Sequence, residues 1–574
     1  MRNTIPIAVS LAVLAMSCSD AGSSAGSSSP TTDTARVTLP EFADDLRDVV
    51  PPDAEYRVCR PEERPSSMTV WISLDNLYKE AVDAEVARFT AETGVTVNLV
   101  SNIGGEFEML ERLAELDTDD WPDAVFAHEY MGRALADTNR LVRPEDCDPG
   151  FRERVLPAAR AANTVDGVLA AAPVWASTQL VYYDAAKLAA AGIETSQSAS
   201  FDDVLSWAEQ AVSAGAAEHG LMLSAGCGEL LGQHLLAAHG GAALPDNGRG
   251  VRGARLTMRS DEVAALAADL AALRVGLTDG SVMNLEADST GFADLLAVAD
   301  RTISGAVAIH TSSSLGPVLT AVDTAYPWVD AQVVPFSGGL VGTTGLWMFG
   351  SDAPGRSSPA WSLVDWLTQP AAAARLAAAA GFVPAVQGAT DEPALAATWS
   401  EEPRLSVPRD AIAEATDSVF STTYLVGPWR QVRSAWTRLC EAMTSPDVDL
   451  TQAVADMLDE VNNVIDAYEM ARIASPVAES SVPIDLEVRC DTGDEVAGVW
   501  VQTAISSSGF AEPAGDGHFR FTLDSGGPFV VHVGCGEADG RWLAVGWSPI
   551  LEGTTGEIVC SGDRSQLPGS CRVA

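Results

Sequence analysis

Apolar strands alternate with amphipathic helices over a long part of the chain. Met68–Ser73 has the pattern of a buried strand, apolar residues follow at helical spacing over Leu77–Glu92, and Gly94 is placed to end that helix. The same order then repeats, with a strand at 95–100, a helix at 107–116 and a strand at 124–127. Strands that alternate with helices indicate βαβ units, so we expect an α/β fold with a parallel sheet.

A second region of the same type follows Val168. It begins with the extended run Val181–Tyr183 and continues through helices at 202–214 and 260–274, a strand at 306–309, an extended stretch at 340–349, and helices at 358–367 and 371–379. A last long amphipathic helix is predicted over Leu450–Ala474. We therefore expect the α/β region to span residues 68–475.

The pattern changes after Ser475 to short β-type runs separated by Gly, Ser and Asp turns. These runs lie at 484–490, 498–504, 517–523, 529–533 and 542–547. They predict a small β-sandwich or barrel over residues 482–574, appended to the α/β body. Four cysteines in this segment would compensate for its small core.

The N-terminus has the pattern of an export signal. Arg2 precedes an apolar stretch from Ile5 to Met16, and Ser17-Cys18 follows, similar to a bacterial lipobox in which the cysteine is lipidated after cleavage. Residues 19–67 then form a flexible tether and connecting segment that begins rich in Ser, Gly and Thr. We expect a signal peptide over residues 1–18 and a lipid anchor at Cys18; an ordinary signal peptide cut nearby is the alternative.

The cysteines indicate disulfides rather than a metal site. Setting aside Cys18 leaves eight of nine, an even number in an exported chain. Their clustering favours Cys59 with Cys147, Cys227 with Cys440, and two bridges within the last hundred residues, although eight cysteines allow many pairings. No Cys-x-x-Cys pair occurs, which disfavours zinc and thioredoxin-like chemistry.

Charge excludes one class of partner. The 574 residues carry 35 Lys and Arg against 79 Asp and Glu, a formal charge of -44 that repels phosphate backbones. We therefore expect no nucleic-acid partner. After the first twenty residues no apolar run is long enough to cross a bilayer.

Several motifs, in order, resemble extracellular solute-binding proteins of the maltose-binding type, which serve ABC importers. They are the Met68 strand with its helix ending in Phe89-Thr-Ala-Glu-Thr-Gly, Trp121-Pro-Asp-Ala-Val-Phe, Pro173-Val-Trp-Ala-Ser-Thr-Gln-Leu-Val-Tyr-Tyr-Asp, Trp366-Leu-Thr-Gln-Pro with Gly381-Phe-Val-Pro, and Gly427-Pro-Trp-Arg-Gln-Val. Each motif is loose alone, but their shared order over residues 68–470 is specific. The resemblance implies a two-lobed periplasmic-binding-protein-like fold of type II, here with a C-terminal disulfide-bearing β-sandwich.

The resemblance also implies a function. A lipid-anchored protein on the extracellular face of the cell membrane would capture a sugar or oligosaccharide in a cleft between two lobes that close by a hinge, and deliver it to a membrane permease. We expect a monomer without a cofactor, a metal or catalytic activity. The alternative from another class is a cell-surface sensor or adhesion component whose C-terminal β-domain binds a partner.

Candidate solute contacts come from loops at strand ends, where ligands bind in folds of this class. They are Asp75 and Asn76 after the first strand, Glu129 and Tyr130 after the third, Trp175, Ser177 and Thr178 in the Pro173 segment, Thr311 and Ser312 in the second lobe, and Thr344 and Trp347 in the crossover region. Carboxylates and amides suit sugar hydroxyls, and aromatic faces suit the C–H surface of the ring. Ser177 stands where maltose binders carry an acidic contact, which argues against maltose itself.

Other roles for the same residues stay open. Tyr130, Trp175 and Trp347 are as consistent with packing as with solute contact, and Asp75 is also a helix cap. Trp71, Trp361, Trp366 and Trp429 are assigned to packing. A glycosidase needs two carboxylates across one sugar bond, which Asp75 and Glu129 would supply if they converged. A metal bound by the adjacent Tyr182 and Tyr183 is disfavoured, since neighbouring strand residues point to opposite faces.

Overall fold

The computed structural model describes most of the chain from residue 55 onward. The described residues are 55–59, 65–72, 76–101, 106–116, 120–223, 229–238, 244–249, 255–284, 305–310, 319, 323, 329–350, 358–415, 422–474, 482–491, 493, 495–503, 507–515, 517–523, 529–536, 542–547, 551, 555–560 and 569–573. The predicted signal peptide, Cys18 and the tether up to residue 54 lie outside them, and so do Asp75, Thr311 and Ser312.

The first lobe opens with the predicted βαβ units. Strands β1 (Ser67–Ile72), β2 (Thr96–Val100) and β3 (Ala124–His128) are parallel, and helices α2 (Asn76–Thr93) and α3 (Glu106–Glu115) connect them. These bounds lie within two residues of the prediction. Gly94 adopts a left-handed φ of 77° directly after α2, as expected for a helix C-terminus.

Four strands from later in the sequence complete the first-lobe sheet, namely β7, β13, β14 and β4, of which β4 pairs with β13 beside the main path. Its strand order is β14-β7-β13-β3-β1-β2, with β7 (Ala172–Thr178) and β13 (Val341–Phe349) antiparallel to one another and β13 antiparallel to β3. The sequence assigned Trp175, Ser177 and Thr178 to a loop at a strand end, whereas the structure makes them part of β7. Their near-continuous burial explains the error, because a strand covered on both faces lacks the polar alternation that marks a strand in sequence.

Short elements fill the rest of the first lobe. They are η1 (Glu129–Met131), α4 (Gly132–Asp137), β4 (Leu141–Val142), α5 (Pro144–Cys147), α6 (Phe151–Arg154), α7 (Pro157–Ala162), β5 (Thr164–Val165), β6 (Val168–Leu169), α14 (Trp361–Leu367), α15 (Pro370–Ala380), β14 (Val383–Pro384), η3 (Ala389–Asp391), α16 (Pro393–Glu401), η4 (Pro403–Ser406) and α17 (Val407–Glu414). Cys59 is bonded to Cys147, which confirms the predicted bridge.

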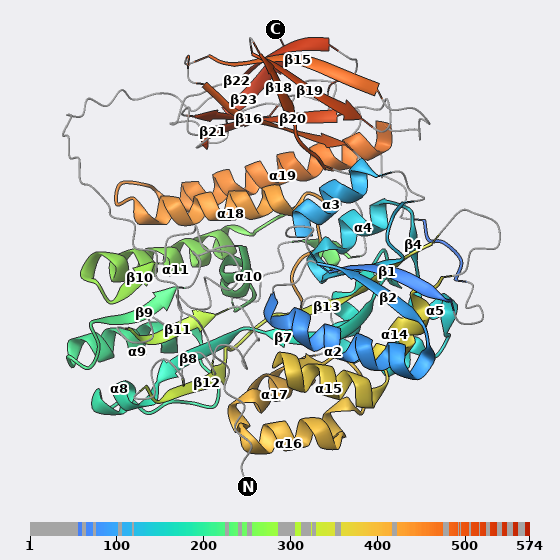
Figure 1. Ribbon diagram of the computed structural model, residues 1–574. Helices are drawn as coiled ribbons and strands as arrows, with labels where there is room; N and C mark the ends of the chain where they lie inside the picture. The colour runs from blue at the N-terminus through green and yellow to red at the C-terminus, as the bar shows by residue number, and fades with distance from the viewer. Residues whose placement is uncertain are drawn as a thin grey trace, which may run out of the picture. The chain divides into compact units, whose positions relative to one another are not determined.

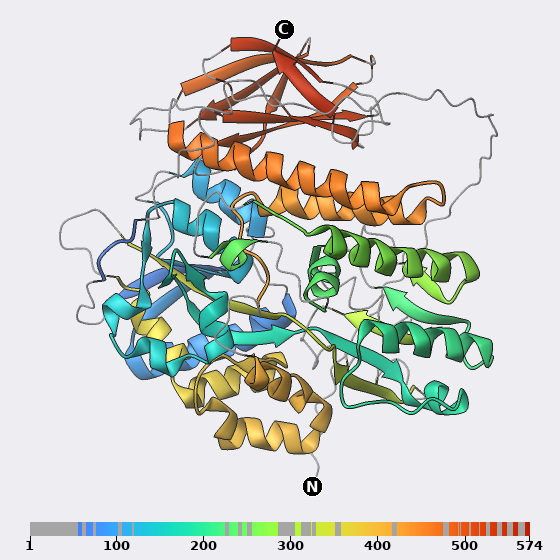
Figure 2. The same cartoon turned by 180° about the vertical axis from the view of Figure 1, so that it is seen from behind.

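The second lobe is built on a sheet with strand order β10-β9-β11-β8-β12. Its strands are β8 (Leu180–Asp184), β9 (His219–Leu223), β10 (Val282–Asn284), β11 (Gly305–His310) and β12 (Ala331–Pro335). The helices of this part of the chain are α8 (Ala185–Ala190), α9 (Phe201–Ser213), α10 (Glu229–Ala238), η2 (Pro245–Gly248), α11 (Ser260–Asp279), α18 (Trp429–Thr444) and α19 (Leu450–Ala474). Helices α18 and α19 lie side by side in both views and share the apolar core of this lobe (Figures 1 and 2).

The chain passes between the lobes at three described places. Gln179 joins β7 to β8, residues 336–340 join β12 to β13, and residues 422–428 lead into α18. We call residues 422–428 the third crossing. Its residues alternate between the cores, since Tyr424 and Val426 pack in the second-lobe core while Leu425 packs against first-lobe residues.

The C-terminal part forms a β-sandwich. Its strand order is β17-β16-β20-β21-β23-β22-β15-β19-β18, with bounds β15 Val482–Cys490, β16 Glu495–Thr503, β17 Ser507–Phe510, β18 Glu512–Gly515, β19 His518–Leu523, β20 Phe529–Gly536, β21 Trp542–Trp547, β22 Thr555–Cys560 and β23 Gly569–Val573. The bridges Cys490–Cys535 and Cys560–Cys571 confirm the two predicted disulfides of this segment. Cys440 is also disulfide-bonded, and its predicted partner Cys227 lies outside the described residues.

Candidate functional site

Several of the candidate residues lie at one end of the first-lobe sheet, where strands β3, β13 and β7 begin or end. The parallel strand β3 ends at His128, which is paired with Thr344 of β13. On the other side of β13, Ser177 of β7 is paired with Gly342. Residues 128–130, 177–178 and 342–344 therefore share one end of the sheet, beside the places where the chain crosses to the second lobe.

Glu129 joins β13 to the third crossing. Its side chain is 2% exposed, and its carboxylate accepts hydrogen bonds from the backbone N–H of Thr343 at 2.7 Å and from the Thr423 hydroxyl at 2.9 Å. Burial raises the pKa of Glu129, and these two donors together with His128 oppose that rise. The sequence predicted a solute contact here, and the structure adds a link between β13 and the third crossing.

Gly342 has little space beside it. A Cβ at this position would lie 3.0 Å from the Ser177 Oγ and 3.6 Å from a carboxylate oxygen of Glu129. A side chain at position 342 would therefore crowd both the Ser177 hydroxyl of β7 and the Glu129 carboxylate. Glu129 itself is hydrogen-bonded to β13 and to the third crossing.

Three rings stack directly beyond the end of β3. Tyr130 lies between His128, at 5.3 Å and 5° between the ring planes, and Trp429, at 5.2 Å and 15°. Tyr130 is half-buried and packs against the cores of both lobes. Trp429 belongs to the second-lobe core and is 2% exposed, so the packing role predicted for Trp429 is confirmed. The stack thus joins a first-lobe strand end to the first turn of α18.

The buried carboxylate of Glu106 holds two rings of this stack, His128 and Tyr130, by hydrogen bonds. Glu106, at the start of α3, accepts hydrogen bonds from the backbone N–H and the Nδ1 of His128, at 2.6 and 2.9 Å, and from the Tyr130 hydroxyl. Burial raises the pKa of Glu106, but the His128 and Tyr130 interactions outweigh burial, and the net pKa is lowered. The carboxylate is therefore held in its charged form, while burial raises the pKa of Tyr130 well above its ordinary value.

Trp175 and Trp347 lie inside the first lobe. Trp175 is 1% exposed and stacks on Phe382 with ring centroids 4.7 Å apart. Trp347 is fully buried, donates its indole N–H to the Ala127 carbonyl at 3.2 Å, and would lie 2.5 Å from a Cβ added at Gly132. These contacts favour the packing alternative for both tryptophans. Thr178 and Thr344 are buried at the shared edge, and Ser177 is partly exposed there.

The remaining candidates are placed less completely. Asn76 is the first residue of α2, and its side chain lies outside the described part. Asp75, Thr311 and Ser312 also lie outside it, so their roles stay predictions. Trp71 is 6% exposed within a first-lobe core and carries Arg112 over its ring at 5.4 Å, which confirms the packing role predicted for it.

Sequence reasoning missed Glu106 and Thr423. Glu106 follows two glycines after the second strand, a position at a strand's carboxyl end that the same loop rule would have selected. Thr423 had no such signal, because its bond to Glu129 joins residues 294 positions apart.

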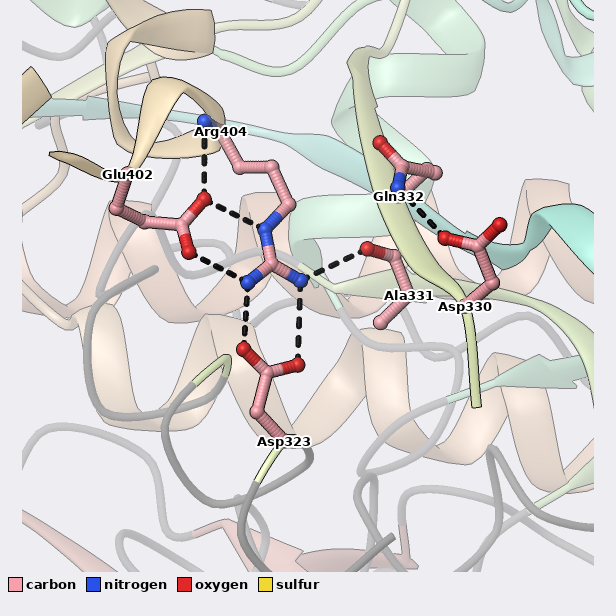
Figure 3. Close-up of polar contacts among 6 residues, drawn as sticks. All are labelled: Asp323, Asp330, Ala331, Gln332, Glu402 and Arg404. Atoms are coloured by element: carbon pink, nitrogen blue, oxygen red, sulfur yellow. Dashed lines mark hydrogen bonds and ion pairs between the residues drawn. The ribbon is translucent and has the colours of Figure 1, made fainter. Parts of the chain in front are cut away.

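A second set of polar contacts joins the helices after α15 to the second-lobe sheet. Arg404 donates to Asp323 at 2.6 Å, to Glu402 at 2.6 Å and to the backbone carbonyl of Ala331 in β12 at 2.9 Å (Figure 3). These acceptors raise the pKa of Arg404, with the Glu402 contact as the largest cause. Beside it an apolar cluster combines Tyr182 of β8 with Leu395 and Trp399 of α16. These contacts therefore tie the lobes together at a place separate from Glu129.

Metal-ligand clusters and membrane-spanning helices bear on function. Among the described residues, no group of three or more His, Cys, Asp or Glu side chains is arranged to hold a metal ion. No helix within the described ranges combines the length and apolar character needed to cross a membrane.

Comparison with solved structures places the fold. The GacH receptor of Streptomyces glaucescens GLA.O, solved without ligand and with acarbose, matches with 16% identity and a TM-score of 0.56 over 70% of this chain and 99% of the receptor. The UgpB protein of Mycobacterium tuberculosis with glycerophosphocholine matches with 17% identity and a TM-score of 0.53 over 71% and 99%. The MalE sugar-binding protein of Xanthomonas citri gives 16% and 0.55 over 70% and 97%. These likenesses confirm the predicted two-lobed α/β fold.

Comparison with sequences gives the family. No curated protein matches the chain significantly. The model of a family described as bacterial extracellular solute-binding protein matches residues 84–405, which is more than half of the 574 residues. The matched region contains the second-lobe sheet, the first-lobe sheet except β1, the first two crossings and Glu129. The chain therefore belongs to the bacterial extracellular solute-binding proteins.

Proposed function

We propose that this protein binds a carbohydrate between its lobes and delivers it to an ABC transporter permease without chemical change. The observation that carries the proposal is the His128–Tyr130–Trp429 stack, which stands at a strand's carboxyl end and contacts the cores of both lobes through Tyr130. Ligands of open α/β sheets bind beyond strand carboxyl ends. His128 forms the outer end of the stack with its side chain 39% exposed, and an aromatic face there suits the C–H surface of a sugar ring.

The polar groups beside the stack fit the same class of solute. Ser177, Thr178 and Thr344 bring hydroxyl groups to this edge, and hydroxyl groups both donate to and accept from sugar hydroxyls. We retain Tyr130 with these three as proposed contacts, and also Asp75, Asn76, Thr311 and Ser312 as predicted from sequence. Glu129 is proposed to act mainly by holding the crossings, since its carboxylate already accepts two protein hydrogen bonds.

The structural neighbours support a carbohydrate over other solutes. Solved structural neighbours are described with acarbose, cyclic alpha-maltosyl-1,6-maltose, alpha-D-tagatose, cycloalternan and maltotetraose. One neighbour is named with glycerophosphocholine, which makes a phosphodiester the competing solute class.

Thermal unfolding of the purified protein, with disulfides oxidised, tests the solute class. The panel consists of maltotetraose, acarbose, cycloalternan, tagatose and glycerophosphocholine. A solute present at about one hundred times its dissociation constant stabilises the folded state by about 2.7 kcal/mol. Stabilisation by a carbohydrate supports the proposal, and stabilisation by glycerophosphocholine alone would replace it with a phosphodiester binder.

We further propose that Cys18 carries a lipid that holds a monomeric protein on the extracellular face of the membrane. The apolar stretch Ile5–Met16 with Ser17-Cys18, followed by a Ser- and Gly-rich tether, supports this anchor. Replacing Cys18 by Ser is expected to release the protein into the medium. Retention of the Cys18→Ser variant in the membrane fraction would contradict the anchor.

The C-terminal sandwich favours a second candidate function, a sensor or adhesion component that docks a partner. The neighbours are matched over 97–100% of their own length while covering about 70% of this chain, and the family match ends at residue 405. Deleting residues 482–574 separates the candidates. Unchanged solute affinity and import would make the sandwich accessory, whereas loss of partner binding with unchanged solute affinity would support docking.

A further inference from the structure

A short segment of the second-lobe sequence leaves its own core and contacts the first lobe. We call residues 244–249 the strap. It begins at Leu244, which is 1% exposed in the second-lobe core, and then takes three consecutive left-handed residues, Asp246, Asn247 and Gly248, with φ of 45°, 51° and 77°. A Cβ at Gly248 would lie 2.1 Å from the Leu425 carbonyl oxygen. The strap is therefore shaped to lie directly against the third crossing.

Hydrogen bonds join the strap to the third crossing. The Asn247 side-chain amide donates to the Thr422 carbonyl, and the Asn247 carbonyl accepts from the Leu425 N–H at 2.9 Å. Arg249 Nη1 donates to the Thr423 carbonyl at 2.5 Å. Three successive parts of the crossing are thus fixed by two strap residues.

The same strap is bonded to the first lobe. Arg249 donates through Nε and Nη2 to the Ala162 carbonyl at 3.3 and 3.1 Å, and its own carbonyl accepts from the Gly167 N–H at 3.3 Å. Arg133, buried beside Asp166, donates to the Gly248 carbonyl at 3.0 Å. The strap is therefore an additional, non-covalent connection between the lobes.

The Arg249 guanidinium is buried and is hydrogen-bonded to backbone carbonyls. It is 1% exposed, and within the described part of the chain its hydrogen-bond acceptors are the neutral carbonyls of Ala162, Asn247 and Thr423. Burial lowers the pKa of Arg249 to about 10, and Glu129 is the acid that favours its charged form. A buried charge without a contacting carboxylate is costly, so its placement is better explained by orientation of its partners than by stability alone.

We propose that Arg249 is a positioning residue for solute capture, because it holds the Thr423 backbone so that the Thr423 hydroxyl reaches the Glu129 carboxylate, which also accepts from β13. This inference rests on the proposed function. The route runs from Arg249 through Thr423 to Glu129 and on to the Thr343 N–H of β13, each step being a hydrogen bond given above. Arg249 itself is not proposed to touch the solute.

Hydrogen exchange followed by mass spectrometry tests the route in the full chain without solute. Arg249→Met removes the guanidinium, and Thr423→Val removes the hydroxyl while keeping the backbone carbonyl that Arg249 binds. Both variants are expected to raise amide exchange about tenfold at residues 341–344, as the loss of one hydrogen bond would. Arg255→Met is the matched control, since Arg255 follows closely in sequence but is paired with Asp466 on α19. Unchanged exchange at 341–344 in Thr423→Val overturns the proposal even if Arg249→Met fails to fold.

A double-mutant cycle adds the functional readout. Titration with maltotetraose compares Arg249→Met, Thr423→Val and the double variant. If Arg249 acts through Thr423, the double variant binds maltotetraose about as weakly as the weaker-binding single variant. If the two substitutions act independently, the fold-losses in affinity of the single variants multiply in the double variant, and that result overturns the proposal. If maltotetraose does not bind the wild type, that result counts against the proposed function and the exchange experiment alone decides the role of Arg249.

Discussion

Glu129 accepts a hydrogen bond of 2.9 Å from the hydroxyl group of Thr423, which lies 294 residues further along the chain. The two residues come from different segments, the end of β3 and the third crossing, and Thr343 of β13 supplies the second donor to the same carboxylate. A buried acid is stable in this position only while both donors are present. The geometry of the crossings and the ionisation of Glu129 are therefore linked.

Thr423→Val is expected to destabilise the fold. The substitution keeps the side-chain shape but leaves the buried Glu129 carboxylate with one donor fewer, which costs about 1–3 kcal/mol. Chemical denaturation measures the free energy of unfolding. The control is Thr437→Val, because Thr437 is half-buried on α18 and, among the described residues, its hydroxyl donates within its own helix, at 3.1 Å to the Arg433 carbonyl. Equal losses in the two variants would contradict the assigned role of Thr423.

Glu129 and Glu106 are expected to give opposite pH dependences. The folded-state pKa of Glu129 is raised. The stability of the wild type relative to Glu129→Gln is therefore greatest below the ordinary pKa of 4.5, and this advantage is lost as pH rises through the folded-state pKa. The folded-state pKa of Glu106 is lowered, so relative to Glu106→Gln the wild type is fully favoured above 4.5 and loses that advantage as pH falls through the folded pKa.

Unfolding free energies of the wild type and both variants, measured from roughly pH 3 to 8, check these signs. Each variant serves as the control for the other, since both replace a buried carboxylate with an amide of the same shape. Two curves with the same sign would show that the hydrogen-bond assignments of the two acids are wrong.

Tyr130→Phe separates the hydroxyl group of Tyr130 from its ring. The variant keeps the stack on His128 and Trp429 but removes one donor from Glu106, so we expect a loss of about 1–3 kcal/mol at neutral pH and a higher Glu106 pKa. Tyr183→Phe is the control, because within the described part of the chain the Tyr183 hydroxyl makes a single long contact, of 3.4 Å to Thr195. Denaturation at neutral and acidic pH measures both effects, and a loss that stays the same on acidification would argue against the Glu106 contact.

How far sequence predicted the fold depends on how regular each pattern is. Helix α19 has the predicted bounds, Leu450–Ala474, because a long amphipathic period is a strong signal. Strands β22 and β23 were missed, since Gly and Ser interrupt their apolar alternation and their pairing depends on partners far away in sequence.

The candidate site was predicted less completely than the fold. Glu129 and Tyr130 were selected because they follow a strand directly, and the structure does bring them to the lobe crossings. Trp175 and Trp347 carried the same local signal, yet they pack into cores, because the direction of a strand side chain depends on which face the second layer covers. No pattern within one segment predicts a partner such as Thr423.

The two bridges of the C-terminal sandwich are expected to contribute unequally. Loop-closure entropy assigns about 4 kcal/mol to Cys490–Cys535, which spans 45 residues, and about 3 kcal/mol to Cys560–Cys571, which spans 11. Paired Cys→Ala variants compared by denaturation measure the difference, with Cys59–Cys147 in the first lobe left intact as the internal reference. A larger loss from removing the shorter bridge would contradict this ordering.

Calorimetric titration of the wild type and of Tyr130→Leu with the carbohydrate panel measures whether the Tyr130 ring supports carbohydrate binding. Tyr130→Leu removes the ring between His128 and Trp429, whereas Tyr130→Phe retains it and serves as the control. We predict that at least one carbohydrate binds the wild type, that Tyr130→Leu weakens binding about tenfold or more, equivalent to about 1.4 kcal/mol, and that Tyr130→Phe weakens it less. Binding of no carbohydrate, or equal affinity in the wild type and Tyr130→Leu, would contradict this prediction.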